Sequence, residues 1–437
     1  SVLDLRAVVA AVQVCADPPC LGTPSFQLSY GAVLGLCLVT PRLAARVPER
    51  TPWLLRAPLL SLCATAGATV GTLGPAAWWL QSLPVASPLA NLVALPVVAC
   101  LLVPAALLWT WAPAPLDGWA LWLGELGGDV LLAVLSPLDG PVLHPAVGPA
   151  GALALAALPV VWRYRGLTLA LLVGVFLPRP LPSSRLTLLD IGQGDALVVD
   201  HPDGQTWLVD GGPRRREVLH YLRRTGRTHL DVVVATHNHP DHIEGLGPVL
   251  RELSVDELWI GDTAGIEPLL ALATARGTRV RYRPGLAPRR PAEAEANDLS
   301  VVLPVLDAAL LTGDAEWAAE EALLTQSAGS LRSEVLKLGH HGSRTSTSDA
   351  LLDAVDPRLA LVSCARDNTY GHPHAVVTDR LAARDIPVFS TAEHGTLALD
   401  VLPDGLRLSA HHHGRWTPLW SGPRRDATAA PSPAPPR

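Results

Sequence analysis

Residues 236–242 read THNHPDH and follow LDVVVA at 230–235, an apolar run rich in β-branched residues. The run predicts a buried strand, so four side chains of metal-ligand type come within the six residues 237–242. His237 and His239 alternate as at a strand end and can face one point, while Asp241 and His242 follow Pro240 and can face a second. Imidazole and carboxylate suit Zn²⁺, Mn²⁺ or Fe. A solvated histidine-rich loop is the alternative, and the HxHxDH spacing after a strand favours a metal site.

This spacing resembles the signature of the metallo-β-lactamase superfamily, and the resemblance covers roughly residues 185–410. It implies an αββα sandwich with one or two metal ions at one edge of its sheets. Four further stretches carry the resemblance: LDIGQGDALVV at 189–199, LLTGD at 310–314, LKLGHHGS at 336–343 and NTYGHPH at 368–374.

The resemblance also implies a set of metal ligands for two divalent ions, Zn or Mn. A carboxylate at Asp314 can bridge two metals, although it can also cap the helix predicted to follow. Either His340 or His341 completes the set, and we favour His340. No histidine lies between His242 and Asp314, so the third histidine of many two-metal members has no counterpart. The predicted ligands are His237, His239, Asp241, His242, Asp314 and His340.

Three residues are predicted to act in the chemistry: Asp241, Asp195 and His372. Asp195 can orient a ligand histidine from behind, or simply cap its turn. His372 can be a ligand, a general acid or a phosphate contact. Asp210, in DGG at 210–212, resembles a residue that supports the metal loop. Lys337, the single lysine, suits a place near a phosphate or plain strand packing.

The first part of the chain has a different composition. The chain is 437 residues long, which predicts at least two domains, and few of its charged residues lie within 1–180. Apolar windows there approach the length of a membrane span. The windows are 24–40, 57–80 and 87–111, an amphipathic stretch at 118–135 that can lie in the interface or line a cavity, and two short runs at 148–162 and 166–178.

Two motifs in this apolar part resemble the membrane domain of ComEC-type DNA-internalisation competence proteins: FQLSYGAVLGL at 26–36 and NLVALP at 91–96. In that family a membrane channel domain precedes a metallo-β-lactamase-like domain, as here. Gln27 and Asn91 can also be simple interhelical hydrogen-bonding groups. The chain starts at Ser1 and contains no methionine, so we expect a fragment that begins inside the channel domain. Arginines at 42–56 and 163–165 predict cytoplasmic loops, which places the second domain outside the cytoplasm.

We therefore predict a polytopic helical membrane domain at 1–180, an α/β metallo-β-lactamase-like domain at 185–413 and a disordered tail at 414–437. The predicted function is DNA uptake in the plasma or inner membrane, with a metal-dependent nuclease acting on incoming DNA. The alternatives are a non-catalytic DNA guide and a membrane-anchored hydrolase for a non-DNA substrate. Expected partners are DNA, membrane lipid and other competence proteins. Arginine-rich stretches at 214–227 and 276–290 can contact phosphates or form solvated faces.

Overall fold

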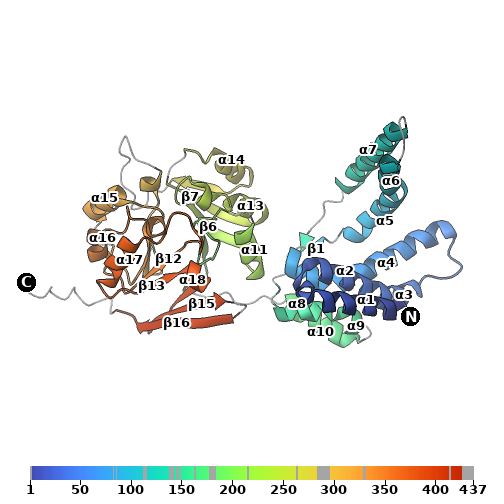
Figure 1. Cartoon of the computed structure of the whole chain (residues 1–437), viewed down its shortest axis with the longest axis horizontal. Helices are drawn as coiled ribbons and strands as arrows, with labels where there is room; N and C mark the ends of the chain where they lie inside the picture. Colours follow the sequence, from blue (N-terminus) through green and yellow to red (C-terminus); the bar gives the residue numbers. More distant parts are fainter. Residues whose placement is uncertain are drawn as a thin grey trace, which may run out of the picture. The chain divides into compact units, whose positions relative to one another are not determined.

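The computed structural model divides into two compact units, one built from the helices before residue 180 and one from the sheets after it (Figure 1). Each unit is described by itself. The structure describes residues 2–81, 83–84, 86–111, 116–136, 142–143, 147, 149–161, 164–176, 184–213, 216–261, 264–282, 296–327, 331–412 and 415–425.

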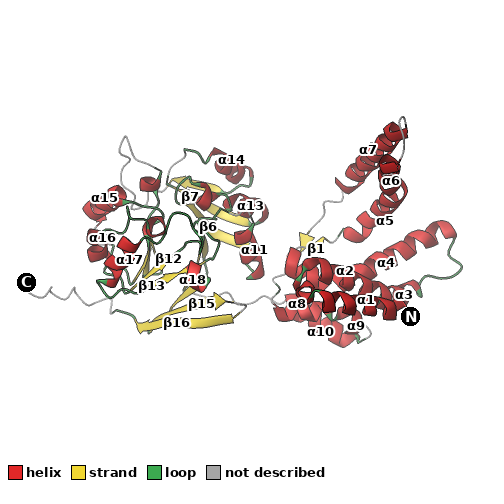
Figure 2. Ribbon diagram, in the orientation of Figure 1, coloured by secondary structure: helices red, strands yellow, loops and turns green. Residues whose placement is uncertain are grey.

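The first unit is almost entirely helical (Figure 2). Its α-helices are α1 (Val2–Ala16), α2 (Pro24–Leu38), α3 (Thr40–Ala44), α4 (Trp53–Pro75), α5 (Ser87–Val97), α6 (Val103–Trp111), α7 (Leu116–Leu135), α8 (Pro149–Ala156), α9 (Leu158–Val161) and α10 (Arg165–Phe176). Short turns of other helix types are η1 (Pro18–Gly22), η2 (Ala76–Leu80) and η3 (Val98–Leu102), and β1 (Leu83–Pro84) pairs with β2 (Val142–Leu143).

Three helical stretches in the described part of the chain are long and apolar enough to cross a membrane: Trp53–Leu80, Leu89–Trp111 and Asp117–Leu135. The first two coincide with predicted windows. The third is the stretch predicted to be amphipathic, and its 19 residues have the length and composition of a span. The window at 24–40 holds the 15-residue helix α2, which is shorter than a span of about 20 residues.

Glycines bring α2 and α4 into close contact. A Cβ atom on Gly35 would lie 2.0 Å from the carbonyl oxygen of Gly67, and one on Gly71 would lie 2.0 Å from that of Gly31. Each helix thus carries a Gly-x-x-x-Gly pair that lets the backbones meet, the packing that suits helices in lipid. Gln27 of α2 makes a contact with η2, because its Oε1 accepts a hydrogen bond from Nε1 of Trp79 at 2.9 Å.

The second unit contains two sheets. The nine-stranded sheet has the order β16-β15-β14-β3-β4-β5-β6-β7-β8, and the five-stranded sheet has the order β13-β12-β11-β10-β9. The first sheet comprises β3 (Arg185–Leu188), β4 (Leu197–Asp200), β5 (Thr206–Val209), β6 (His229–Ala235), β7 (Ser254–Ile260), β8 (Arg279–Tyr282), β14 (Thr396–Val401), β15 (Gly405–His412) and β16 (Arg415–Pro423). The second comprises β9 (Leu303–Val305), β10 (Ala309–Leu311), β11 (Val335–Lys337), β12 (Leu359–Val362) and β13 (Val388–Ser390).

Helices cover the outer face of each sheet, which gives the predicted αββα layers. One apolar core lies between the sheets, and it includes Val232 and Val234 of β6 together with Leu311 of β10. Two further cores lie under the helices on either side. The helices are α11 (Glu217–Arg224), α12 (Pro240–Ile243), α13 (Leu246–Glu252), α14 (Glu267–Ala275), α15 (Trp317–Ser327), α16 (Asp349–Val355), α17 (Ala375–Ala382) and α18 (Thr391–His394), with short turns η5 (Asn297–Leu299) and η7 (Gly339–Gly342).

The prediction of a disordered tail from residue 414 is wrong for residues 415–425. Arg415–Pro423 forms strand β16, which pairs antiparallel with β15. The strand is held because Leu419 and Trp420 pack against the core between the sheets, despite the many prolines and arginines nearby. Residues 426–437 of the predicted tail lie outside the described residues.

Candidate metal centre

Three chain segments bring the candidate ligands to one edge of the sandwich. Strand β6 ends at Ala235 and leads into residues 236–243, β10 ends at Leu311 just before Asp314, and β11 ends at Lys337 just before the turn η7. Strands β10 and β11 are parallel neighbours, so their carboxyl ends lie at the same edge of the five-stranded sheet. The sequence places a ligand-type side chain directly after each strand, and the fold makes them meet.

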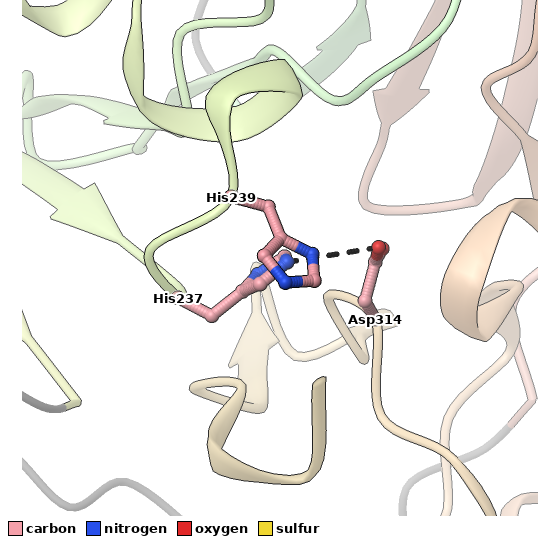
Figure 3. Close-up of side chains that lie close together, drawn as sticks. All are labelled: His237, His239 and Asp314. Atoms are coloured by element: carbon pink, nitrogen blue, oxygen red, sulfur yellow. Dashed lines mark ion pairs between the residues drawn. The ribbon is translucent and has the colours of Figure 1, made fainter. Parts of the chain in front are cut away.

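A first group consists of His237, His239 and Asp314, which point toward one another in Figure 3. Each offers a ligand atom within 4.8 Å of the others, and Nε2 of His237 lies 3.7 Å from Oδ2 of Asp314. His237 and Asp314 are buried and His239 is half-buried. The predicted pairing of the two histidines on one point is therefore what the structure has.

A second group consists of Asp241, His242 and His341. Oδ2 of Asp314 lies 3.2 Å from Nε2 of His242 and 3.7 Å from Nε2 of His341. The Asp314 carboxylate therefore lies beside both groups. A carboxylate in this place could serve ions held by either group.

Unpaired polar atoms test whether this site fits metal ions. Among the described residues, Nε2 of His237, His242 and His341 and Oδ1 of Asp314 are buried without a hydrogen-bond partner. Burying a polar atom unpaired costs about 1–3 kcal/mol, so four such atoms at one place need another partner. Imidazole nitrogens and carboxylate oxygens are ligands of Zn²⁺ and Mn²⁺, so the residues fit the expected ions.

Hydrogen bonds at Nδ1 fix the orientation of three candidate ligand histidines. Nδ1 of His242 lies 2.8 Å from Oδ2 of Asp210, and Nδ1 of His341 lies 2.9 Å from the carbonyl oxygen of Ser363. Nδ1 of His237 lies 3.0 Å from Oγ1 of Thr236. With Nδ1 donating in each case, Nε2 carries the free lone pair that a metal ion needs.

The electrostatics keep His237, Asp241 and Asp314 in the forms that bind metal. Burial, helped by the nearby His242, lowers the pKa of His237 to about 2, so this imidazole stays neutral. Burial opposes ionisation of Asp241, but the nearby His341 and the charge of His242 lower its pKa to about 2. The same balance holds the pKa of Asp314 well below its ordinary value. Burial opposes the charge of His242, but the carboxylates of Asp314 and Asp210 raise its pKa well above the ordinary value, so without metal this imidazole holds a proton that a metal ion would displace.

Comparisons with known proteins agree with this geometry. Residues 1–177 match the family model "Competence protein", and residues 189–308 match that of the metallo-beta-lactamase superfamily. The chain carries a competence-family domain followed by a metallo-β-lactamase domain. This pair of domains confirms the predicted relationship to the ComEC-type competence proteins.

Named relatives come from three bacteria. "Competence protein ComA" of Neisseria gonorrhoeae is 32% identical over 75% of this chain and 49% of its own length. "ComE operon protein 3" of Bacillus subtilis is 28% identical over 48% of this chain and 32% of its own length. "Recombination protein 2" of Haemophilus influenzae is 32% identical over 52% of this chain and 30% of its own length. The chain thus spans about half or less of the relatives it matches.

His340, the histidine favoured from the sequence, lies outside both groups. His341 belongs to the second group instead. Nδ1 of His340 lies 2.6 Å from Oε1 of Glu316, and its Nε2 stays 3.9 Å from Oδ2 of Asp314. Both histidines have left-handed backbone angles, with φ of 45° and 54°. In this turn the side chain of His341 is buried and that of His340 is partly exposed, a difference that the sequence alone does not reveal.

Asp195 and His372 lie beside the site. Asp195 is buried against Lys337, and its Oδ1 lies 3.6 Å from Nδ1 of His341. His372 is half-buried, and burial together with His341 and His340 lowers its pKa to about 4. Their catalytic roles remain predictions. Asp210, which the sequence singled out only by its motif, is the carboxylate that contacts a ligand histidine directly.

Proposed function

We propose that this chain is part of a membrane protein for DNA uptake, and that its second unit hydrolyses phosphodiester bonds of incoming DNA with divalent metal ions. The observation that carries the proposal is the meeting of unpartnered histidine nitrogens and carboxylate oxygens in a chain that also holds a competence-family domain. The names of two relatives refer to competence and recombination, which supports DNA as the substrate.

Two metal ions, Zn²⁺ or Mn²⁺, would be held by the two groups with Asp314 between them. Such ions would supply a more acidic water and a positive charge to stabilise the transition state. The chain's own residues would hold the ions, and their hydrogen-bond partners orient the histidines. His237, His239 and Asp314 would be the protein ligands of the first ion. Asp210 and Ser363 hold His242 and His341 in the metal-binding tautomer.

Several arginines of the two predicted basic clusters already lie beside carboxylates. Arg227 is buried in an ion pair with Asp200 at 2.6 Å, and Arg216 pairs with Glu252 at 2.8 Å. Arg281 lies 2.7 Å from Glu257, which also neighbours Arg279 at 3.4 Å. Arg214, Arg215, Arg283, Arg289 and Arg290 lie outside the described residues.

The location is part of the proposal. Apolar helices and the competence-family domain support a protein of the plasma or inner membrane. The arginines at 42–56 support a cytoplasmic loop there and an extracytoplasmic second unit. Membrane lipid and other proteins of the uptake machinery are the partners that this placement implies.

The full chain in lipid nanodiscs provides the test. We expect it to cleave DNA in Mn²⁺ or Zn²⁺ and not in EDTA, and Asp314→Asn to abolish cleavage. The matched control is Asp404→Asn, which removes an exposed carboxylate in the β14–β15 turn and should cleave normally. DNA binding in EDTA with no cleavage in any metal would contradict the nuclease activity and favour the non-catalytic DNA guide. Cleavage of small phosphodiesters but not of DNA would favour the non-DNA hydrolase.

A further inference from the structure

Tyr370 is an exposed aromatic side chain near the metal centre. It lies in the loop between β12 and α17, within NTYGHPH, and 68% of its surface is accessible to solvent. The proposed chemistry does not use this residue. An exposed tyrosine alone has no special meaning, so its neighbours decide what it can do.

The ring of Tyr370 is the outermost of three nearly parallel rings. Tyr370 lies on His372, with ring centres 5.7 Å apart and planes 26° from parallel. His372 lies in turn on His341, with ring centres 6.4 Å apart and planes 27° from parallel. His341 belongs to the second group of candidate ligands. A stack of rings therefore leads from the metal centre to an aromatic residue open to solvent.

Hydrogen bonds hold this loop in place. Oδ1 of Asn368 accepts from the backbone N–H of His372 at 2.8 Å, and Nδ2 of Asn368 donates to the carbonyl oxygen of His372 at 2.7 Å. The backbone N–H of His374 donates to the carbonyl oxygen of Gly342, which follows His341. A Cβ on Gly342 would lie 2.7 Å from Cβ of Pro373, so the two loops fit closely. Because the loop is fixed, little ordering entropy is lost when the ring binds a ligand.

We propose that Tyr370 is a stacking platform for an unpaired nucleobase next to the phosphate at the metal centre. This inference rests on the proposed function and deepens it by naming the substrate class as single-stranded DNA. Every base has a π-face that can stack on an aromatic ring without sequence preference, and such stacking is a main source of affinity for single strands. In a duplex the neighbouring bases already cover those faces, so the platform selects unpaired bases. His372 also borders a cavity of about 520 Å³.

The experiment measures binding by the full chain in nanodiscs, in EDTA, so that cleavage plays no part. Fluorescence anisotropy is recorded with a single-stranded oligonucleotide, the matching duplex, and an oligomer of equal length that lacks bases. We expect Tyr370→Ala to bind the single strand about 10-fold more weakly. The matched control Tyr370→Phe, which keeps the ring, should bind like the wild type. For duplex DNA we expect the same affinity in all three proteins, and the same holds for the base-free oligomer.

Further outcomes separate this platform from the proposed nuclease. Where metal-dependent cleavage occurs, Tyr370→Ala should raise KM for single strands with kcat little changed. Equal single-strand affinity of Tyr370→Ala and wild type overturns the platform, even if the protein cleaves DNA. An equal loss on base-free DNA also overturns it, because the loss would then not come from stacking. If the protein does not cleave DNA but Tyr370→Ala loses affinity only for unpaired bases, the stacking platform is supported and the nuclease is contradicted.

Discussion

Nδ1 of His242 lies 2.8 Å from Oδ2 of Asp210, and neither side chain has surface exposed to solvent. The carboxylate accepts a hydrogen bond from the Nδ1–H group of His242, and Nε2 of His242 faces Asp314. The same oxygen accepts a hydrogen bond from Oγ1 of Thr236, and the other oxygen accepts from its backbone N–H. One carboxylate therefore joins the end of β6 to a candidate ligand.

Asp210→Asn should weaken metal binding without removing a ligand. An amide nitrogen in place of Oδ2 cannot accept the Nδ1 proton of His242, so the tautomer that binds metal is no longer favoured. Loss of such a partner typically costs roughly 10- to 100-fold in metal affinity. Calorimetric titration of the metal-free protein with Zn²⁺ measures this, and Asp404→Asn is the control for carboxylate removal. Unchanged affinity in Asp210→Asn would show that this contact does not orient His242.

His340 and His341 offer a matched pair of neighbouring substitutions. His341→Ala removes a member of the second group, so we expect it to lower the amount of metal bound per chain. His340→Ala removes a side chain whose Nδ1 faces Glu316, and the bound metal should remain as in the wild type. Elemental analysis of the purified variants gives the metal content directly. The reverse result would restore the assignment to His340 that the sequence favoured.

The contrast between these two histidines shows where sequence reasoning ends. The αββα fold and the ends of β6, β10 and β11 follow from apolar runs that stop at polar motifs. The choice between His340 and His341 depends instead on two consecutive residues with left-handed backbone angles, and no local sequence pattern predicts that conformation. Strand β16 was missed for a similar reason, because its stability comes from Leu419 and Trp420 packing on a distant core. The partners Asp210 and His242 are 32 residues apart, so only the folded chain joins them.

Acid should destabilise the metal-free protein through His237. Its pKa is about 2 in the folded state and about 6.5 in an unfolded chain, so below pH 6.5 the unfolded state binds more protons. Stability from this group is complete above pH 6.5 and falls as the pH drops toward 2. Between pH 7.5 and 5.5 the contribution of His237 should fall by about 1.4 kcal/mol, measured as the difference from His237→Asn because the raised pKa of His242 acts in the opposite direction. Hydrogen exchange of β6 in EDTA measures it, and His237→Asn should lose less than the wild type. An equal loss in both proteins would assign the acid sensitivity to other groups.

The contact between α2 and α4 makes their glycines intolerant of even a methyl group. In Gly35→Ala the new Cβ would fall 2.0 Å from a carbonyl oxygen of Gly67, so the helices must move apart. Gly124 in α7 is the matched control, since nothing lies within 4 Å of a Cβ built there. We expect Gly35→Ala to lower the melting temperature of the protein in detergent and Gly124→Ala to leave it unchanged or raise it. Equal melting temperatures would mean that the helices do not pack through these glycines.

Lys337 should be needed for stability as the partner of a buried carboxylate. Its ammonium group contacts Asp195, it donates to the carbonyl oxygen of Gly313 at 3.0 Å, and both charged side chains are only 1% exposed. Lys337→Met leaves the Asp195 charge buried without its cation, which typically costs about 3–5 kcal/mol. Adding Asp195→Asn removes that charge, so the double variant should be more stable than Lys337→Met alone. Hydrogen exchange of β11 in EDTA measures the stability of all four proteins in this cycle. Strictly additive losses would mean that the two side chains do not interact, and Lys337 would then matter only for packing.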